Sequence, residues 1–275
     1  MSPNFGLPKR LPMRLRPWVE CPLAVLAPLR GVLTDIDDTL TRDGAIVPAA
    51  LAALARLAAA QIPVIAITGR PSGWSEPFAL AWPVAAIVAE NGAVMLRREG
   101  AALRLDFVNP QAVRQANARA LAACARAVLD KVPGAVLARD SAGRLTDIAI
   151  DHSEFSHLDA ERIAQVQALM QRHGLSATVS SIHINGWIGG HNKLSGASWA
   201  VEVALGWAFD PTEWIFVGDS TNDQTLFEHL PLCVGVANIA RFVPQLVHLP
   251  AWVTAGERGA GFAEVADRVL AARRA

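Results

Sequence analysis

The sequence predicts an α/β protein with a doubly wound, Rossmann-like parallel core sheet and an α+β cap domain inserted into the chain. Short apolar runs rich in β-branched residues recur in both end regions, and helical patterns separate several of them. The middle of the chain changes to alternating polar and apolar residues. A length of 275 residues also favours a core plus a smaller partner over one domain.

The expected core strands are the apolar runs at residues 31–34, 63–68, 85–89, 214–217, 232–236 and 251–254. Each run is too short for a helix and apolar throughout, as strands buried on both faces are. Helices are expected at 48–61, 194–205 and 221–230: Pro48 begins the first, Gly206 ends the second and Pro231 stops the third. Strands and helices therefore alternate as in a doubly wound sheet.

The middle of the chain has a different pattern. Residues 103–108 and 144–151 alternate between polar and apolar, and amphipathic helices are expected at 110–129 and 159–173. A strand with one solvated face indicates an open-faced sheet. We therefore assign residues 97–184 to the inserted cap, residues 25–96 and 185–275 to the core, and residues 1–24 to an N-terminal arm.

The N-terminal arm imitates a signal peptide, because basic residues precede the apolar stretch at residues 21–29. That stretch contains Pro22 and Pro28, and cleavage after it would fall against the first core strand. We expect a proline-rich arm lying on the surface instead.

The composition argues against several classes of partner. The chain has 25 Lys and Arg against 25 Asp and Glu, so it has no basic field for nucleic acid. No apolar run is long enough to cross a bilayer. Cys21, Cys124 and Cys233 are scattered, which argues against both a disulfide framework and a zinc site. We expect a cytoplasmic protein; the sequence does not predict an oligomeric state.

Polar residues follow the predicted core strands at their carboxyl ends, which is where open α/β sheets bind ligands. Four strands end in such motifs: Asp35-Ile36-Asp37-Asp38-Thr39, Thr68-Gly69-Arg70, Glu90-Asn91-Gly92 and Gly218-Asp219-Ser220-Thr221-Asn222-Asp223.

The carboxylates of these motifs predict a magnesium site. Alternate residues of a strand point the same way, so Asp35 and Asp37 can face one site. Asp219 and Asp223 can add oxygen ligands, and hard oxygen ligands in a phosphate site favour Mg²⁺. The predicted metal ligands are therefore Asp35, Asp37, Asp219 and Asp223.

The same residues suit hydrolysis of a phosphate monoester. Asp35 would attack phosphorus and form an aspartyl-phosphate, while Asp37 would protonate the leaving oxygen and later deprotonate the attacking water. Lys193 is one of few lysines and begins a helix, whose N-terminus favours an anion. The predicted phosphate binders are Thr68, Gly69, Lys193 and Asn222.

The order Asp-x-Asp-x-Thr, Thr-Gly-Arg, Lys, Gly-Asp-x-x-Asn-Asp, over about residues 34–236, resembles the haloacid dehalogenase-like superfamily. Residues 87–94 and the long insertion before Lys193 resemble its Cof-like branch, which includes sugar-phosphate phosphatases with a large α/β cap. The resemblance implies that Asp35 is nucleophile and metal ligand, and that Asp37 is acid/base and a metal ligand through its backbone carbonyl. It implies phosphate binding by Thr68 and Lys193 and metal binding by Asp219 and Asp223.

The segment at residues 181–187 resembles the return strand of the cap, which in that branch lies near the substrate. Asn185 and Trp187, together with Asn91, are therefore candidate substrate contacts. We expect specificity to come from cap residues near 144–152 and 183–187.

Several residues have plainer interpretations. Asp35-x-Asp37 alone could be a turn or helix cap, but four ordered motifs at strand ends argue against chance. Arg70 is either a substrate contact or a surface ion pair. His183 and His191 lack a matching carboxylate, so we take them as surface or packed residues. Asp38 has the wrong phase on the strand and is expected to shape the loop alone.

These observations predict a Mg²⁺-dependent phosphatase of a small phosphorylated metabolite, with a sugar phosphate suggested by family analogy. A phosphomutase with the same aspartate nucleophile is the nearest alternative. A non-catalytic phosphoacceptor resembling receiver domains, or a degenerate binding protein, is the alternative from another class. Receivers are small and need neither a cap nor an acid such as Asp37.

Overall fold

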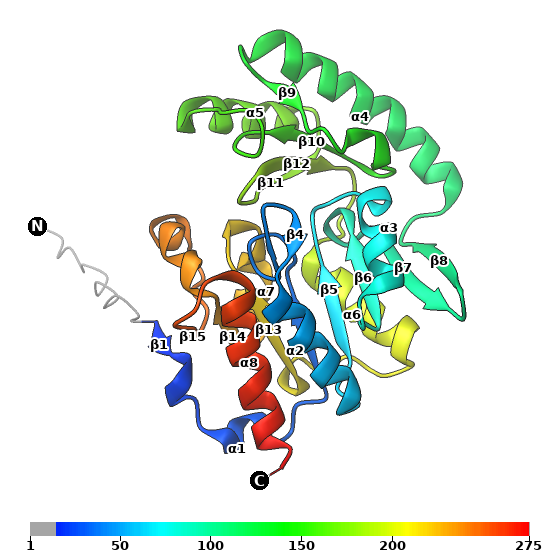
Figure 1. Cartoon of the computed structure of the whole chain (residues 1–275). Coiled ribbons are helices and arrows are strands. Elements are labelled where there is room, and N and C mark those ends of the chain that lie inside the picture. The colour runs from blue at the N-terminus through cyan, green and yellow to red at the C-terminus, as the bar shows by residue number, and fades with distance from the viewer. Residues whose placement is uncertain (1–14, 275) are drawn as a thin grey trace, which may run out of the picture.

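The computed structural model of the protein describes residues 15–274 and contains a nine-stranded central sheet (Figure 1). Its strands, in spatial order, are β1 (Arg16–Pro17), β15 (Trp252–Val253), β14 (Cys233–Gly235), β13 (Trp214–Gly218), β2 (Gly31–Thr34), β5 (Val64–Ile67), β6 (Ala86–Ala89), β7 (Val94–Glu99) and β8 (Ala102–Phe107). All pairs from β1 to β6 are parallel, and β7 and β8 are antiparallel. The predicted parallel α/β core is confirmed.

Helices cover both faces of this sheet. The face toward the viewer in Figure 1 carries α2 (Pro48–Ala59), α3 (Ser72–Ala81) and α8 (Arg258–Ala272), with the short α1 (Leu23–Leu26) at the foot of α8. The other face carries α6 (Lys193–Leu205) and α7 (Gln224–His229). Within β2, Val32 packs into the hydrophobic cluster on one face of the sheet and Leu33 into the cluster on the other face, as the two-residue period of a strand requires. The apolar runs are thus apolar because both faces are buried.

Local signals set the ends of the helices near the site. α6 begins at a capping box, in which the Asn192 side chain accepts from the backbone N–H groups of Leu194 and Ser195. It ends at Gly206, whose φ of 70° is the left-handed conformation that glycine adopts without strain. Between β2 and α2 the chain forms the small hairpin β3 (Thr41–Arg42) and β4 (Ala45–Ile46).

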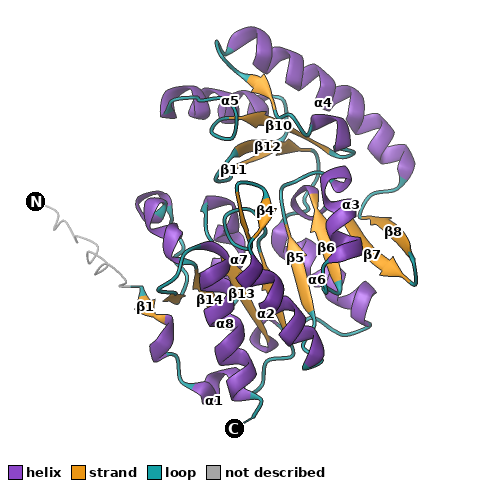
Figure 2. Ribbon diagram, viewed as in Figure 1, coloured by secondary structure: helices purple, strands orange, loops and turns teal. Residues whose placement is uncertain are grey.

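The inserted cap has its own sheet and its own core. Four antiparallel strands lie in the order β11 (Ser176–Val179), β12 (His183–Trp187), β10 (Asp147–Asp151) and β9 (Val136–Leu137). Both α4 (Gln111–Lys131) and α5 (Ala160–Arg172) pack on the face away from the core, where they bury a cluster that includes Val128, Met170 and Ile184 (Figure 2). The other face is turned toward the core.

The strands divide between the two sheets differently from the expected boundaries of 97 and 184. β7 and β8 both extend the core sheet, although residues 97–107 were assigned to the cap. The alternation of residues 103–108 arises because one face of this edge hairpin packs on the core, through Leu103, Leu105 and Phe107. β12 is a central strand of the cap sheet, although residues 185–187 were assigned to the core.

The described part of the N-terminal arm is built into the core. β1 pairs with β15, and Trp18 is 1% exposed, packs edge-on against Trp252 and donates to the Glu264 carbonyl oxygen. The expectation of a surface arm is therefore wrong for Trp18 and Cys21, which are buried core side chains, whereas most other residues from 16 to 24 are exposed. Residues 1–14 of the arm lie outside the described residues.

Among residues 15–274, the helices are too short or too polar to cross a membrane.

Candidate active site

The strand order places the predicted motifs side by side. β2 lies between β13 and β5, so the residues that follow these three strands share one edge of the sheet. The Asp35 N–H donates to the Val217 carbonyl oxygen (2.9 Å), and the Thr68 N–H donates to the Val88 carbonyl oxygen (2.8 Å). The sheet ladder thus continues into the loops and fixes the backbone of both residues.

Three carboxylates form a buried group at this edge. Oxygen atoms of Asp35, Asp219 and Asp223 lie within 4.8 Å of one another. Asp219 Oδ1 is buried and has no hydrogen-bond partner within residues 15–274. Burial, together with the charges of Asp35 and Asp223, raises the pKa of Asp219 well above its usual range. An unpartnered oxygen in a cluster of like charges fits a bound cation, so these residues suit Mg²⁺.

Lys193 stands against this carboxylate group from the first turn of α6. Its Nζ donates to Asp35 Oδ1 (2.6 Å), to Asp223 Oδ1 (2.7 Å) and to Asn222 Oδ1 (3.2 Å). Burial opposes its charge, yet Asp223 and Asp35 raise the pKa of Lys193 above its usual value, so it stays an ammonium ion. Burial raises the pKa of Asp35 to about 7 against the lowering effect of Lys193.

Thr68 and Gly69 line the same edge from the end of β5. The Thr68 hydroxyl oxygen accepts from the Arg70 N–H at 2.9 Å. A Cβ on Gly69 would lie 3.2 Å from Oδ1 of both Asn91 and Asn185, so only glycine fits without displacing them. The Gly69 carbonyl oxygen accepts from Asn185 Nδ2 at 3.1 Å.

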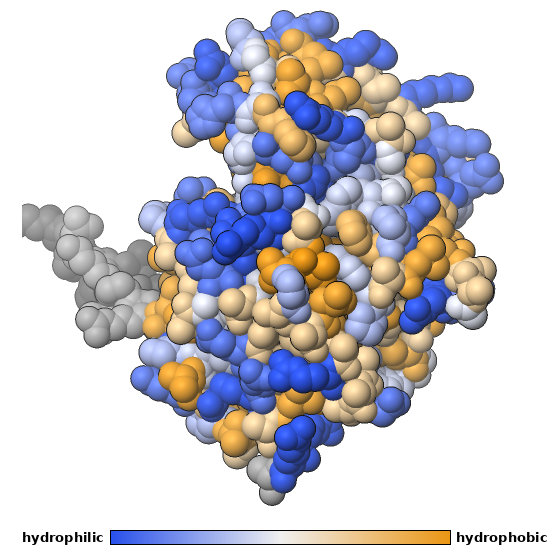
Figure 3. Space-filling model, in the orientation of Figure 1, coloured by the Kyte–Doolittle hydropathy of each residue, from blue (hydrophilic) through white to orange (hydrophobic). Residues whose placement is uncertain are grey.

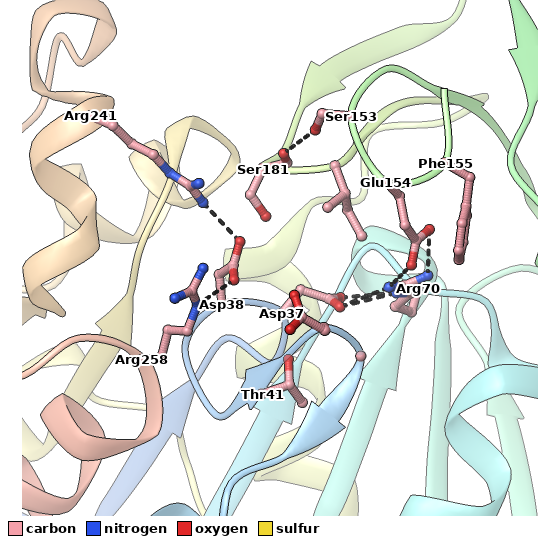
Figure 4. A pocket seen from close by; sticks show the side chains of 13 residues that line it. Asp37, Asp38, Thr41, Arg70, Ser153, Glu154, Phe155, Ser181, Arg241 and Arg258 are labelled. Atoms are coloured by element: carbon pink, nitrogen blue, oxygen red, sulfur yellow. Dashed lines mark hydrogen bonds and ion pairs between the residues drawn. The ribbon is translucent and has the colours of Figure 1, made fainter. Parts of the chain in front are cut away.

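Asp37 faces a different partner from Asp35. Its Oδ1 accepts from Arg70 Nε (3.1 Å) and Nη2 (3.0 Å) (Figure 4). Arg70 is only 5% exposed and also bonds Asp140 and Glu154 of the cap. It is therefore a buried ion pair between core and cap, which neither sequence interpretation of this residue described. Its position directly after Thr68-Gly69 at a strand end was the available signal.

Two adjoining cavities lie between the core edge and the cap. The narrow one, of about 10 Å³, is lined by Asp35, Thr68, Asn222 and Asp219, among others. The wide one, of about 340 Å³, is lined by Asp43 and Arg258 of the core and by cap residues. The cavities share Asp37, Arg70, Ser181 and Ile182. In Figure 3 the surface is notched between the cap above and the core below, with hydrophilic residues beside the notch.

The cap reaches the wide cavity with Ser153, Glu154 and Phe155 after β10, which the sequence analysis missed. It also reaches it with Ser181 and Ile182 before β12, at the start of the 181–187 segment that was expected near the substrate. The Asp151 carboxylate accepts from the backbone N–H groups of residues 153, 154 and 155, which folds this turn toward the core. An Asp at a strand end followed by polar residues was the only local signal for this turn.

The three predicted substrate contacts differ in whether they line a cavity. Asn185 lines the narrow cavity, whereas Asn91 and Trp187 line neither cavity. Asn91 is 1% exposed and donates to Asp147 Oδ2 at 3.4 Å, and Trp187 is 3% exposed and donates to the His191 carbonyl oxygen at 2.9 Å. The Asn91 contact joins core and cap, and Trp187 is buried against the segment that follows β12, so substrate contact by these two side chains stays a prediction.

The structure also places the two histidines and the third aspartate of the first motif. His183 is buried and its Nε2 lies 2.9 Å from Glu154 Oε2, and His191 is buried beside Trp187. Asp38 has a φ of 56° and forms ion pairs with Arg258 (2.7 Å) and Arg241 (2.8 Å) at the wide cavity. It therefore does more than shape its loop.

Residues 32–118 match the family model of haloacid dehalogenase-like hydrolases. Over these residues the chain is similar to haloacid dehalogenase-like hydrolases. A search of curated protein sequences finds no match.

Solved structures share the fold of this chain over most of its length. Protein 0175 of Thermoplasma acidophilum has a TM-score of 0.67 at 17% identity, covering 88% of this chain and 98% of that one. Sucrose-phosphatase of Synechocystis sp., solved with sucrose and phosphate, has a TM-score of 0.64 at 16% identity, with coverage of 88% and 98%. The C-terminal domain of trehalose-6-phosphate phosphatase from C. albicans has a TM-score of 0.62 at 13% identity, with coverage of 95% and 99%. At these identities the likeness concerns the fold.

Proposed function

We propose that the protein is a Mg²⁺-dependent phosphatase that hydrolyses a small phosphorylated metabolite, a sugar phosphate, through an aspartyl-phosphate on Asp35. The observation that carries this proposal is the position of Asp37. It lies where a narrow cavity containing Asp35 meets a wide cavity, which is where the oxygen between phosphorus and a leaving group would lie.

The narrow cavity has the groups that a phosphoryl group needs. Thr68 lines it, and the Lys193 ammonium lies 2.6 Å from Oδ1 of Asp35, which also lines it. The backbone of the Asp35 loop is fixed by the sheet. Asp35, Asp219 and Asp223, with the backbone carbonyl of Asp37, would hold Mg²⁺. When bound, the ion would neutralise phosphoryl oxygens and the carboxylate cluster.

The two aspartates divide the reaction between them. A carboxylate oxygen of Asp35 attacks phosphorus, the bond from phosphorus to the leaving oxygen breaks, and Asp37 gives that oxygen a proton. Water then attacks the aspartyl-phosphate and passes a proton to Asp37, which releases inorganic phosphate and restores both side chains. Asp35 must be ionised to attack, and the ammonium of Lys193 at 2.6 Å favours that form.

The wide cavity supports a sugar as the leaving group. Its volume of about 340 Å³ suits a small metabolite, and hydroxyl, carboxylate and guanidinium groups line it. Such groups hydrogen-bond sugar hydroxyls, and the Phe155 ring adds an apolar surface. Two of the proteins with a similar fold have names that describe them as phosphatases of sugar phosphates. The three buried, free cysteines support a reducing, cytosolic location.

The direct test is phosphate release from a panel of sugar phosphates, with Mg²⁺ or with a chelator. We expect release that requires Mg²⁺ and is lost in Asp35→Asn. Asp267→Asn is the matched control, because this aspartate lies on the surface of α8 with its side chain 58% exposed. Equal release by wild type and Asp35→Asn would sink the proposal, and formation of an isomeric phosphosugar without phosphate release would indicate a phosphomutase.

A further inference from the structure

All five N–H groups of Arg70 are occupied by carboxylates. Nε and Nη2 donate to Asp37 Oδ1, and Nη2 also donates to Glu154 Oε1 at 2.7 Å. Nη1 donates to Asp140 Oδ2 (3.2 Å) and to Glu154 Oε2 (3.2 Å). Nε also lies 3.2 Å from Asp37 Oδ2, which makes six nitrogen-to-carboxylate contacts for the five N–H donors of a guanidinium. In this arrangement Arg70 lines both cavities but has no donor left for a phosphate or a sugar hydroxyl.

The cap partners of Arg70 are themselves fixed to the cap. The Glu154 N–H donates to Asp151 Oδ1 (2.9 Å), and its carboxylate lies 2.9 Å from Nε2 of His183, which is 2% exposed. Asp140 accepts from Arg144 Nε and Nη2 at 3.2 and 3.1 Å. The cap therefore presents two held carboxylates to the guanidinium of the core.

The planar fork of Arg70 makes the two sides dependent on each other. A guanidinium directs its donors rigidly in one plane, so the contacts on one edge set the orientation of the other edge. Figure 4 shows the Arg70 side chain between Asp37 and Glu154, bonded to both. If the cap moved away, Arg70 would lose Glu154 and Asp140, and its hold on the Asp37 carboxylate would loosen.

We infer that Arg70 is a positioning residue that transmits the placement of the cap, through Glu154 and Asp140, to the orientation of the Asp37 carboxylate. The inference rests on the proposed function, in which Asp37 protonates the leaving oxygen. It assigns Glu154 a role in catalysis without contact with the phosphoryl group. The acid is thereby held for reaction when the cap covers the site.

The test compares two esters of similar size, p-nitrophenyl phosphate and phenyl phosphate, in the full-length protein with Mg²⁺. Phenolate needs a proton from the acid more than p-nitrophenolate does, so the ratio of the two kcat values reports on Asp37. We expect Glu154→Gln to lower the phenyl to p-nitrophenyl ratio about tenfold, with KM within about twofold, because the acid is misplaced and binding is not. Asp140→Asn should change the ratio in the same direction.

A double variant separates positioning from independent effects. Arg70→Lys removes the fork, and Glu154→Gln should add no further loss on top of it, because Glu154 acts through Arg70. The matched control is Glu161→Gln on α5 of the cap, an exposed glutamate that accepts from Gln165, and it should leave the ratio unchanged. Circular dichroism melts check that each variant is folded.

The outcomes distinguish this inference from the proposed function. Suppose that wild type hydrolyses both esters. If Glu154→Gln then leaves the phenyl to p-nitrophenyl ratio unchanged, or if the losses of Arg70→Lys and Glu154→Gln multiply in the double variant, the inference fails and the proposed function stands. A rise in KM without a change in the ratio would make Glu154 a substrate contact and also overturn it. If wild type hydrolyses neither ester, the proposed function fails and the inference falls with it.

Discussion

The candidate active-site edge of the core and the cap turn at residues 153–155 line adjoining cavities, but they are held in different ways. Asp35 and Thr68 continue buried strands, and the hydrogen bonds of the parallel sheet extend into their backbones. The cap turn is held by side-chain contacts, mainly through Asp151 and the Glu154–His183 pair, and Glu154 reaches the core through its ion pair with Arg70. In the proposed reaction, the reacting groups therefore belong to the sheet scaffold, and the groups that face the leaving group belong to a cap loop.

The largest expected effect is on the core side of this comparison. Asp37→Asn should lower steady-state turnover roughly 10³-fold, because the acid and base are lost while Asp35 can still attack. With p-nitrophenyl phosphate the variant should release about one equivalent of p-nitrophenol and retain a phosphoryl group on Asp35. Rapid mixing and intact mass spectrometry measure both. Full turnover in the variant would show that Asp37 is not the general acid and base.

The next effect concerns the stability of the core edge. Lys193→Met leaves Asp35 and Asp223 buried without their ammonium partner, so the free energy of unfolding should fall by about 3 kcal/mol. Mg²⁺ should recover part of this loss, since the unpaired carboxylates bind it. Thermal melts with and without Mg²⁺ test this, with Lys131→Met on the exposed end of α4 as the control. A melting temperature unaffected by the Lys193 change would contradict the buried ion pairs.

A smaller effect concerns pH on the cap side. Burial alone would raise the pKa of Glu154, but hydrogen bonds from His183 and Arg70, and their charges, lower it to about 2 from an ordinary 4.5. A lowered carboxyl pKa gives stability that is present above pH 4.5 and is lost as the pH falls toward 2. The free energies of unfolding of wild type and Glu154→Gln, measured with urea, should therefore converge as the pH falls from 4.5 toward 2. A difference that stays constant with pH would show that Glu154 is not held by these partners.

The smallest effect on stability is expected at the cap residue Phe155, which is 58% exposed. Phe155→Ala should change the free energy of unfolding by less than about 0.5 kcal/mol. It should alter kcat/KM ratios among sugar phosphates by up to about tenfold, because the ring lines the wide cavity. Leu137→Ala, an exposed cap residue away from that cavity, is the control. If the ranking of substrates by kcat/KM is unchanged in Phe155→Ala, Phe155 does not determine specificity.

Much of the core was predictable from local patterns. The six apolar runs became β2, β5, β6, β13, β14 and β15, and the expected helices formed at nearly the expected residues. Asp35, Thr68, Lys193, Asp219 and Asp223 were found because each follows a strand or begins a helix at one sheet edge, a position that chain order and period reveal.

The cap contribution was not predictable in this way. The segments near residues 144–152 and 183–187 were expected to set specificity, yet the turns beside them line the wide cavity. β7 and β8 were misplaced because a half-buried hairpin has the same alternation in a core edge as in a separate sheet. Trp18 was misplaced because its core contacts, with Trp252 and Glu264, lie far along the chain.

The sequence by itself determined the class of fold, the strand ends and the aspartates that stand there, because periodicity and chain order are local properties. Only the tertiary structure decided that Arg70 binds Glu154 and Asp140, which lie 84 and 70 residues away. A buried arginine must find carboxylates somewhere, but which ones depends on how remote segments pack. That packing, not the motif, connects the cap to Asp37.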